Sequence, residues 1–171
     1  MPATPNDLFA FLDKHGIAHK TATHPPLFTV EQSRELRGTI PGAHTKNLFL
    51  KDKRDSVFLV VAPEDAAIDL KTLHQKLGAG RFSFGSSSLM QELLGVLPGA
   101  VTPFGAINDT ARRVNVVLDA GLMRDAIVNA HPLVNTMTTS LASLDLVKFL
   151  EATGHPPRIE AVADGTLPSE N

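Results

Sequence analysis

Residues 44–52 and 57–61 constrain the fold most strongly, because they predict two successive strands with apolar side chains on both faces. In the first segment the side chains alternate, so Leu48 and Leu50 point to one side and Phe49 points to the other. The second segment is apolar at every position and follows a short charged turn. A strand that is apolar on both faces has to be covered on both faces. The two segments therefore predict a hairpin at the centre of a sheet.

Lys46 lies on the same face of the first predicted strand as the two leucines, at the strand's beginning. One interpretation is that its aliphatic stem packs against the core while its ammonium group reaches water. The other is that the ammonium group points into a binding pocket. Position alone favours the first interpretation, because lysines at the edge of a core commonly extend to solvent.

The composition indicates an ordinary globular chain. The 171 residues are 43% hydrophobic, and we predict one domain over residues 1–163 with a flexible tail over residues 164–171. No segment approaches the run of about 20 apolar residues that spans a membrane, and the N-terminus lacks the pattern of a secretory leader. There is no cysteine, which excludes disulfides and thiolate chemistry. We therefore expect a cytoplasmic protein with no membrane partner.

The charge balance also limits the nucleic acids that the chain could bind. The formal net charge of −2 argues against a protein that coats duplex DNA through a broad basic surface. A local basic patch that meets only the end of a nucleic acid remains compatible with this charge. Tyrosine and tryptophan are both absent, so any stacking of bases would use phenylalanine or histidine.

Capping residues and hydrophobic periodicity predict the remaining elements. The expected helices cover residues 5–15, 29–36, 69–77, 88–94 and 143–153, with Ser88 and Ser143 as two of the N-caps. The expected strands cover residues 17–21, 44–52, 57–61, 81–84, 113–119, 126–129, 136–140 and 158–162. Because hairpins are mixed with crossovers, we predict an α+β fold with a mixed, mostly antiparallel central sheet surrounded by short helices.

Several common functional motifs are missing. The seven histidines are scattered and include no His-Glu-x-x-His motif, so we predict no metal and no cofactor. No serine lies in a Gly-x-Ser-x-Gly turn, which argues against that kind of covalent hydrolase. The serines at 86–88 are not followed by Gly-Lys-Ser or Gly-Lys-Thr, so they indicate a helix cap rather than a phosphate loop.

Two other stretches are candidates for a binding site. Residues 95–105 contain three glycines and two prolines, and such a loop can hold backbone N–H groups close to a ligand. The same composition is equally typical of a rigid connector that binds nothing. Residues 131–136 form a turn that is rich in polar groups and begins with His131, a residue that in a turn is usually just a surface group.

Taken together, these stretches resemble the YbaK-like aminoacyl-tRNA editing domains, which also occur inside bacterial prolyl-tRNA synthetases. The resemblance is carried by Thr-Lys-Asn-Leu-Phe-Leu-Lys-Asp at 45–52, Gly-Ala-Val-Thr-Pro-Phe-Gly at 99–105, His-Pro and Asn-Thr within 131–136, and Gly-His-x-Pro at 154–157. It covers about residues 8–162 and is greatest to the free-standing alanyl-tRNA(Pro) deacylases. Ala130 stands where this branch often has a bulkier residue.

The resemblance implies a trans-editing hydrolase that deacylates mischarged Ala-tRNA(Pro). Prolyl-tRNA synthetase cannot fully exclude alanine, because a pocket that fits proline also admits a smaller side chain. The aminoacyl ester is already activated, so a site needs mainly to orient a water molecule and to stabilise charge. The substrate's own ribose hydroxyl would help to position that water.

The resemblance also implies roles for individual residues. Lys46 would be catalytic, holding the terminal adenosine phosphate or the ester and stabilising developing negative charge. Asn47 would orient the lysine or bind the substrate. His131 would contact the adenosine or the α-amino group. The backbone of the glycine loop would form an oxyanion hole fixed by its proline, and its substrate-binding residues are Gly99, Ala100, Val101, Thr102 and Pro103.

The expected partner is the acceptor end of aminoacylated tRNA(Pro), with a transient contact to prolyl-tRNA synthetase and no DNA. The protein is expected to be a monomer. Two alternatives stay open: a deacylase for another small amino acid, such as cysteine or serine, and a non-catalytic module that binds a tRNA end or a protein.

Overall fold

The computed structural model describes residues 1–26, 35 and 39–163, in which short helices pack around one sheet. The helices are α1 (Pro5–Lys14), α3 (Leu70–Leu77), α4 (Ser87–Leu94) and α5 (Ser143–Ala152), with three 3₁₀ segments, η1 (Pro98–Ala100), η2 (Pro103–Asn108) and η3 (Leu122–Arg124). The strands are β1 (His19–Thr23), β2 (Ala43–Asp52), β3 (Val57–Pro63), β4 (Phe82–Phe84), β5 (Val114–Asp119), β6 (Ile127–Ala130), β7 (Met137–Ala142) and β8 (Arg158–Glu160).

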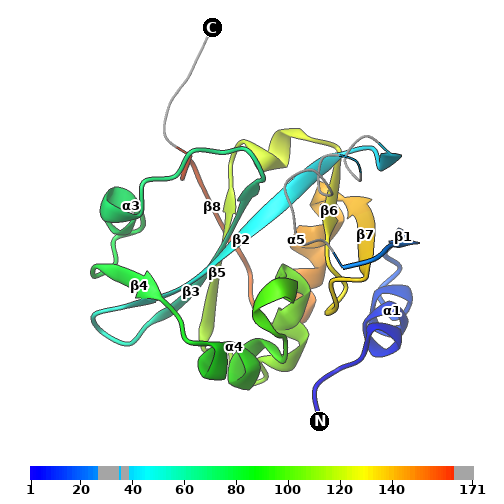
Figure 1. Ribbon diagram of the computed structural model, residues 1–171, viewed down its shortest axis with the longest axis horizontal. Coiled ribbons are helices and arrows are strands. Elements are labelled where there is room, and N and C mark those ends of the chain that lie inside the picture. The colour runs from blue at the N-terminus through cyan, green and yellow to red at the C-terminus, as the bar shows by residue number, and fades with distance from the viewer. Residues whose placement is uncertain (27–34, 36–38, 164–171) are drawn as a thin grey trace, which may run out of the picture.

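The described strands form one mixed sheet in the order β1-β7-β6-β2-β3-β5-β8, and β4 pairs with part of β2. The pairs β1–β7, β2–β3, β2–β4 and β6–β7 are antiparallel, whereas β2–β6, β3–β5 and β5–β8 are parallel. The predicted α+β class and mixed sheet are therefore confirmed. Figure 1 shows the β2–β3 hairpin crossing the molecule, from α3 and β4 at one end toward β6, β7 and α1 at the other.

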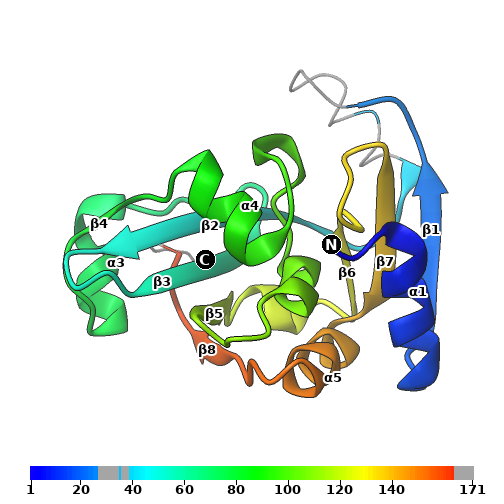
Figure 2. The ribbon, with the colours of Figure 1, turned by 90° about the horizontal axis from the view of Figure 1, so that it is seen from below.

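Two hydrophobic cores cover the two faces of the central hairpin. Alternate residues of β3 enter each core, so Leu59 belongs to one and Val60 to the other, and both are fully buried. The larger core also contains side chains from α1, α4 and α5, and the smaller one is closed by Leu73 and Leu77 of α3. Figure 2 shows α3 beside β4 at one end of the molecule and α1 beside β1 and β7 at the other. This arrangement confirms the hairpin that the apolar pattern predicts.

Some boundaries differ from the prediction. β1 begins at His19, two residues later than expected, because its register is set by pairing with β7. The N-cap of α4 is Ser86, whose hydroxyl accepts from the Leu89 N–H, and so Ser88 is not the cap. α5 starts at Ser143 itself with Ala142 as its cap residue, so the predicted Ser143 cap is also wrong. The predicted helix over residues 29–36 and the predicted tail over residues 164–171 lie outside the described residues, apart from the isolated Glu35.

Candidate functional site

The candidate site lies where β2 separates from β6. β2 pairs with β6 only through Ala43 and His44, and pairs with β3 from Thr45 onward. The Thr45 hydroxyl makes a further link, since it donates to the carbonyl oxygen of Asn129 at 2.7 Å. Beyond that point β2 and β6 pair with different strands, and the glycine loop, residues 97–102, is bonded to β2 and lies near Asn135 in the turn after β6.

One asparagine is hydrogen-bonded to the glycine loop and a second lies beside it. Asn47 on β2 donates from Nδ2 to the Val101 carbonyl oxygen at 3.1 Å. Asn135, in the turn after β6, has its Nδ2 only 3.3 Å from the position that a Cβ on Gly99 would occupy. The Asn47 Oδ1 is buried and accepts no hydrogen bond from any described residue. Since a buried polar atom normally has a partner, this oxygen is a candidate acceptor for a bound ligand.

The backbone N–H groups of the glycine loop are not equivalent. The Ala100 N–H donates to the Leu97 carbonyl at 2.9 Å and closes the η1 turn. Within the described residues, the N–H groups of Gly99, Val101 and Thr102 have no acceptor. Ala100, whose N–H is used within the turn, and Thr102, which is fully buried, are therefore poor candidates for the oxyanion hole that the sequence predicts, and Gly99 and Val101 remain candidates.

Thr102 and Pro103 connect the glycine loop to η2 and fix its end. The Thr102 hydroxyl is buried and accepts from the Phe104 N–H at 3.2 Å, which caps η2. Pro103 occupies the first position of η2, where its missing N–H has no consequence. Both side chains therefore support the glycine loop, and neither is free to contact a ligand through a polar atom.

Lys46 and Asn47 lie on opposite faces of β2. Lys46 pairs with Ala62, which belongs to the smaller core, and its half-buried side chain reaches the Ala66 carbonyl oxygen between β3 and α3. Lys46 has no carboxylate partner in the part of the chain that the structure describes. An ammonium group has three donors, so at least two remain for a ligand. The structure thus joins Asn47 to the glycine loop and not to Lys46.

His131 follows β6 and is fixed by a single backbone contact. Its Nδ1 lies 2.9 Å from the Met137 carbonyl oxygen, and because a carbonyl only accepts, Nδ1 carries the proton. Its Nε2 has no partner among the described residues. Burial lowers the pKa of His131, and the nearby His24 and His44 lower it further against the opposing Met137 contact. The neutral ring therefore presents Nε2 as a hydrogen-bond acceptor.

Ala130 is on the other side of β6 from His131. Its side chain is 6% exposed and belongs to the larger core. The small residue at this position is therefore part of the packing behind the site rather than a group beside the His131 ring.

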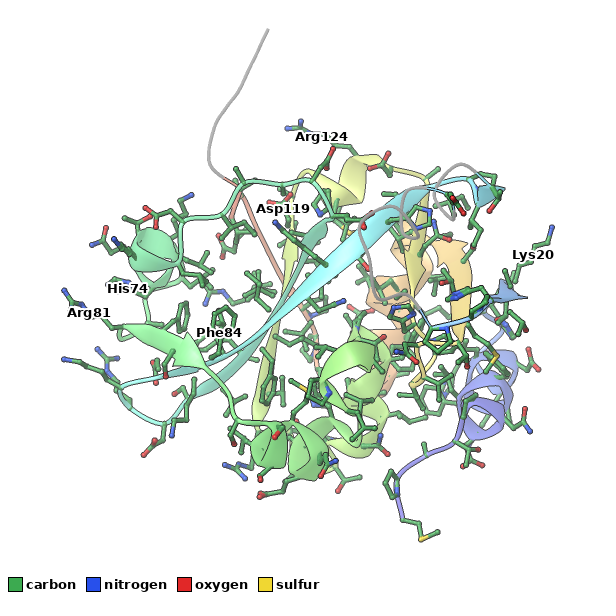
Figure 3. All side chains as sticks on the ribbon, in the orientation of Figure 1. Lys20, His74, Arg81, Phe84, Asp119 and Arg124 are labelled. Atoms are coloured by element: carbon green, nitrogen blue, oxygen red, sulfur yellow. The ribbon has the colours of Figure 1, made fainter. Side chains whose placement is uncertain are left out.

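A basic surface at the opposite end of β2 was not predicted from the sequence. Arg81 and Phe82 border two hollows of about 410 Å³ each, one against α3 and one against the β2–β3 turn. The other basic side chains lining these hollows are Lys51, Lys53, Lys71 and His74. Phe84 on the same strand is 63% exposed, and Figure 3 shows it at the same end of the molecule as Arg81 and His74. We call this the β4 surface. In the sequence, the indication of this surface is Arg81 followed by phenylalanine at alternate positions, 82 and 84.

The structure offers no metal site within the described residues, where no three His, Cys, Asp or Glu side chains are placed to share an ion. His15 and His19 are four residues apart, but α1 ends at Lys14 and His19 begins β1, so they do not share a helix face. His19 instead contacts Asp13 at 2.9 Å. No helix among residues 1–26 and 39–163 is long and apolar enough to span a bilayer.

Comparison with known proteins adds a family and several relatives. A family model described as the aminoacyl-tRNA editing domain matches residues 24–149. The prolyl-tRNA editing protein ProX of Acetoanaerobium sticklandii is 38% identical over 149 residues, which is 86% of this chain and 91% of that protein. The multifunctional Ser/Thr-tRNA deacylase ProXp-y of Escherichia coli is 33% identical over 100 residues, or 57% of this chain and 60% of that protein.

A solved structure of a candidate trans-editing enzyme for prolyl tRNA synthetase superimposes with a TM-score of 0.72. The match covers 96% of this chain and all of the other at 18% sequence identity. At this identity the likeness concerns the fold alone.

Proposed function

We propose that the substrate of this protein is Ala-tRNA(Pro). The premise is that the chain belongs to the aminoacyl-tRNA editing domain family and is an aminoacyl-tRNA deacylase. Similarity to a prolyl-tRNA editing protein over 86% of this chain carries the assignment to tRNA(Pro). A pocket that fits proline cannot fully exclude alanine, because a missing methylene group yields only about 1–3 kcal/mol of discrimination. Aminoacylated tRNA is the partner of this family, and the finer choice of amino acid is our proposal.

The reaction is the attack of water on the carbonyl carbon that joins alanine to the terminal ribose. The N–H groups of Gly99 and Val101, which donate to no described residue and belong to residues that are not fully buried, would bind the oxyanion that forms. Asn47 would hold these donors in place through its bond to Val101. Collapse of the tetrahedral intermediate then releases alanine and leaves the ribose hydroxyl, with the neighbouring ribose hydroxyl helping to place the water.

His131 would bind the α-amino group of the substrate. Its Nε2 is an acceptor at neutral pH, and the substrate's ammonium group is a donor. A neutral imidazole avoids the repulsion that an imidazolium would exert on that ammonium group. Contact with the adenosine is the alternative role for the same nitrogen.

Lys46 would bind the phosphate of the terminal adenosine or the ester itself. Its single described hydrogen bond, to the Ala66 carbonyl oxygen, leaves donors for an anionic group. Since no described carboxylate neutralises it, the charge remains available for a phosphate, whereas the glycine loop that would bind the oxyanion meets β2 on the face of Asn47.

The β4 surface would contact the tRNA beyond its terminal nucleotide. Lys53, Arg81 and Lys71 are exposed and form no salt bridge with a described residue, which suits a polyanionic partner. From Lys46 to Asp52 the strand spans about 20 Å at its usual rise per residue. One RNA arm is long enough to reach both ends of that span.

A second substrate class has its own support. The similarity to a Ser/Thr-tRNA deacylase covers 57% of this chain. A deacylase for serine or another small amino acid, such as cysteine, is therefore the alternative within this activity. A non-catalytic tRNA-end binder is the alternative outside it. We further propose a cytoplasmic monomer that meets prolyl-tRNA synthetase only transiently, as the source of its substrate.

The test is a deacylation panel with purified protein and tRNA(Pro) charged with alanine, cysteine, serine or proline. We expect rapid release of alanine, with Pro-tRNA(Pro) left intact. Faster release of serine than alanine would select the second substrate class. No acceleration over spontaneous hydrolysis with any of the mischarged tRNAs would overturn the activity and favour the binder.

A further inference from the structure

The beginning of β2 is held by one buried side chain of the neighbouring strand. Asn129 on β6 is 2% exposed, and its Nδ2 donates to the carbonyl oxygens of Pro41 at 3.1 Å and of Ala43 at 3.3 Å. Because carbonyl oxygens only accept, the nitrogen of the amide faces them and Oδ1 faces the other way. The Ser140 hydroxyl of β7 donates to that Oδ1. Both ends of the amide are therefore fixed.

The bend between the two bonded carbonyls fits closely against β6. Gly42 has a φ of +105°, which favours glycine. A Cβ on Gly42 would lie 2.7 Å from the Ile127 side chain and 3.0 Å from the Asn129 amide nitrogen. This bend has no side chain of its own with which to pack, so the Asn129 amide supplies a specific attachment.

The backbone of Asn129 makes a second link to β2. Its carbonyl oxygen accepts from the Thr45 hydroxyl, and it pairs with His44 in the two-residue contact between β2 and β6. Lys46 comes directly after Thr45. His131 stands two residues after Asn129, so the two side chains point to the same side of β6. Asn129 therefore joins the strand that carries Lys46 to the strand that leads to His131.

We propose that Asn129 is a positioning residue of the editing site, which sets where the Lys46 ammonium group stands relative to His131. The inference rests on the proposed function, in which Lys46 binds the phosphate of the terminal adenosine and His131 binds the α-amino group. The ester lies between these two groups of the substrate, so their separation decides where its carbonyl carbon meets the glycine loop. A displacement of about 1 Å can cost about 10²-fold in rate.

The first experiment measures the Lys46 contact without any catalysis. The probe is deacylated tRNA(Pro), whose binding constant is measured against salt concentration for wild type, Asn129→Ala, Lys46→Ala and the double variant. Each phosphate contact contributes about 0.7–0.9 to the slope of the logarithm of the binding constant against the logarithm of the salt concentration. We expect each single variant to lower the slope by about that amount. The double variant should lower it no further, because both changes remove the same contact.

Asn115→Ala is the matched control for this experiment. Asn115 on β5 donates from Nδ2 to the Val57 carbonyl oxygen of β3 at 3.0 Å, so it also links two parallel strands, but away from the site. The control should keep the wild-type slope. Thermal melts fix a temperature at which every variant is folded. If Asn129→Ala does not fold, Asn129→Leu replaces it, because leucine keeps the volume and removes the same hydrogen bonds.

The second experiment measures single-turnover deacylation of Ala-tRNA(Pro) by the same proteins. Asn129→Ala should lower the rate by about 10- to 100-fold through misplacement of the substrate. The rate of Asn115→Ala should remain near that of wild type. A loss of rate in Asn129→Ala without a lowered salt slope would mean that Asn129 does not act through Lys46, and it overturns the proposal.

The remaining outcomes separate this inference from the proposed function. A wild-type slope in both Asn129→Ala and Lys46→Ala overturns the phosphate contact of Lys46 and this inference with it. A double variant whose slope falls by the sum of the two single changes also overturns the inference, because Asn129 would then act on a different phosphate contact. If wild type deacylates no mischarged tRNA while both slopes fall, the proposed function is wrong and Asn129 still positions Lys46 against the RNA.

Discussion

The amide nitrogen of Asn47 lies 3.1 Å from the carbonyl oxygen of Val101, and this hydrogen bond ties β2 to the glycine loop. The two residues are 54 positions apart, so the bond links the loop to a strand that is distant in the sequence. Preorganised donors act only if the backbone that carries them stays in place. The Asn47–Val101 bond is therefore where a small change should affect the reaction more than the fold.

Asn47→Ala should lower kcat for Ala-tRNA(Pro) by about 10- to 100-fold, because loss of one preorganised contact typically costs up to 10²–10³ in rate. Its stability loss should be only about 1 kcal/mol, as for other single hydrogen bonds. Asn115→Ala is the matched control, since Asn115 Nδ2 makes the same kind of bond to the Val57 carbonyl at 3.0 Å away from the site. Single-turnover rates and thermal melts compare the two. Equal rates in both variants would contradict the role of Asn47.

Arg81→Glu should raise KM for full-length Ala-tRNA(Pro) by about tenfold and leave kcat nearly unchanged, because a reversed charge repels phosphate. The slope of the logarithm of the binding constant against the logarithm of the salt concentration should decrease by about one for each phosphate contact that is lost. Arg124→Glu, an exposed residue away from the β4 surface in Figure 3, is the control for net charge. The same KM in both variants would remove the β4 surface from tRNA binding.

The central architecture could be predicted because its pattern permits few alternatives. Phe49 and Leu50 point to opposite faces of one strand, and both are at most 2% exposed. Period-two alternation also predicts that Lys46 and Asn47 diverge, as they do. Local details were less determined: three consecutive serines stand at the beginning of α4, and the one that caps the helix is set by the position of the Leu89 N–H rather than by residue type.

The contacts that define the candidate site are long-range, and spacing does not reveal them. The chain gives no local indication that Asn47 reaches Val101, that Lys46 reaches Ala66, or that His24 lies beside His131. The Ala100 N–H illustrates a second limit, because a glycine-rich loop predicts available donors without showing which ones its own turns consume. The role of Arg81 was missed, because a single basic residue just before a short strand indicates no surface until the fold places it beside α3 and the β2–β3 turn.

Treatment with EDTA should leave the deacylation rate unchanged. The chain has no cysteine, and no three potential ligands come together in residues 1–26 and 39–163. An activated ester can be hydrolysed by an oriented water and an oxyanion hole without a Lewis acid. The check is the rate before and after dialysis against the chelator. The metal-free mechanism would be contradicted if the chelator abolished activity and zinc restored it. Magnesium is present in each assay to keep the tRNA folded, and it should not by itself restore the activity.

Lys46→Ala separates the two interpretations of this lysine most clearly. If the ammonium group only reaches solvent, the change trims a packed stem and removes one hydrogen bond to Ala66. The protein should then lose about 1 kcal/mol of stability and keep nearly all of its deacylation rate. If it meets phosphate or the developing oxyanion, the single-turnover rate should fall by about 10²–10³, or about 3–4 kcal/mol. We expect the second result.

Three further variants make the Lys46 test specific. Lys46→Met keeps most of the apolar stem and should lose the same rate with a smaller change in melting temperature. Lys46→Arg should recover activity only in part, because a planar guanidinium group cannot replace a compact ammonium group in a confined site. Lys20→Ala, an exposed lysine on β1, is the control and should behave as wild type. A folded Lys46→Ala protein within about threefold of the wild-type rate, far from the loss expected for a charge contact, would assign Lys46 to the architecture of β2 and leave the chemistry to the glycine loop.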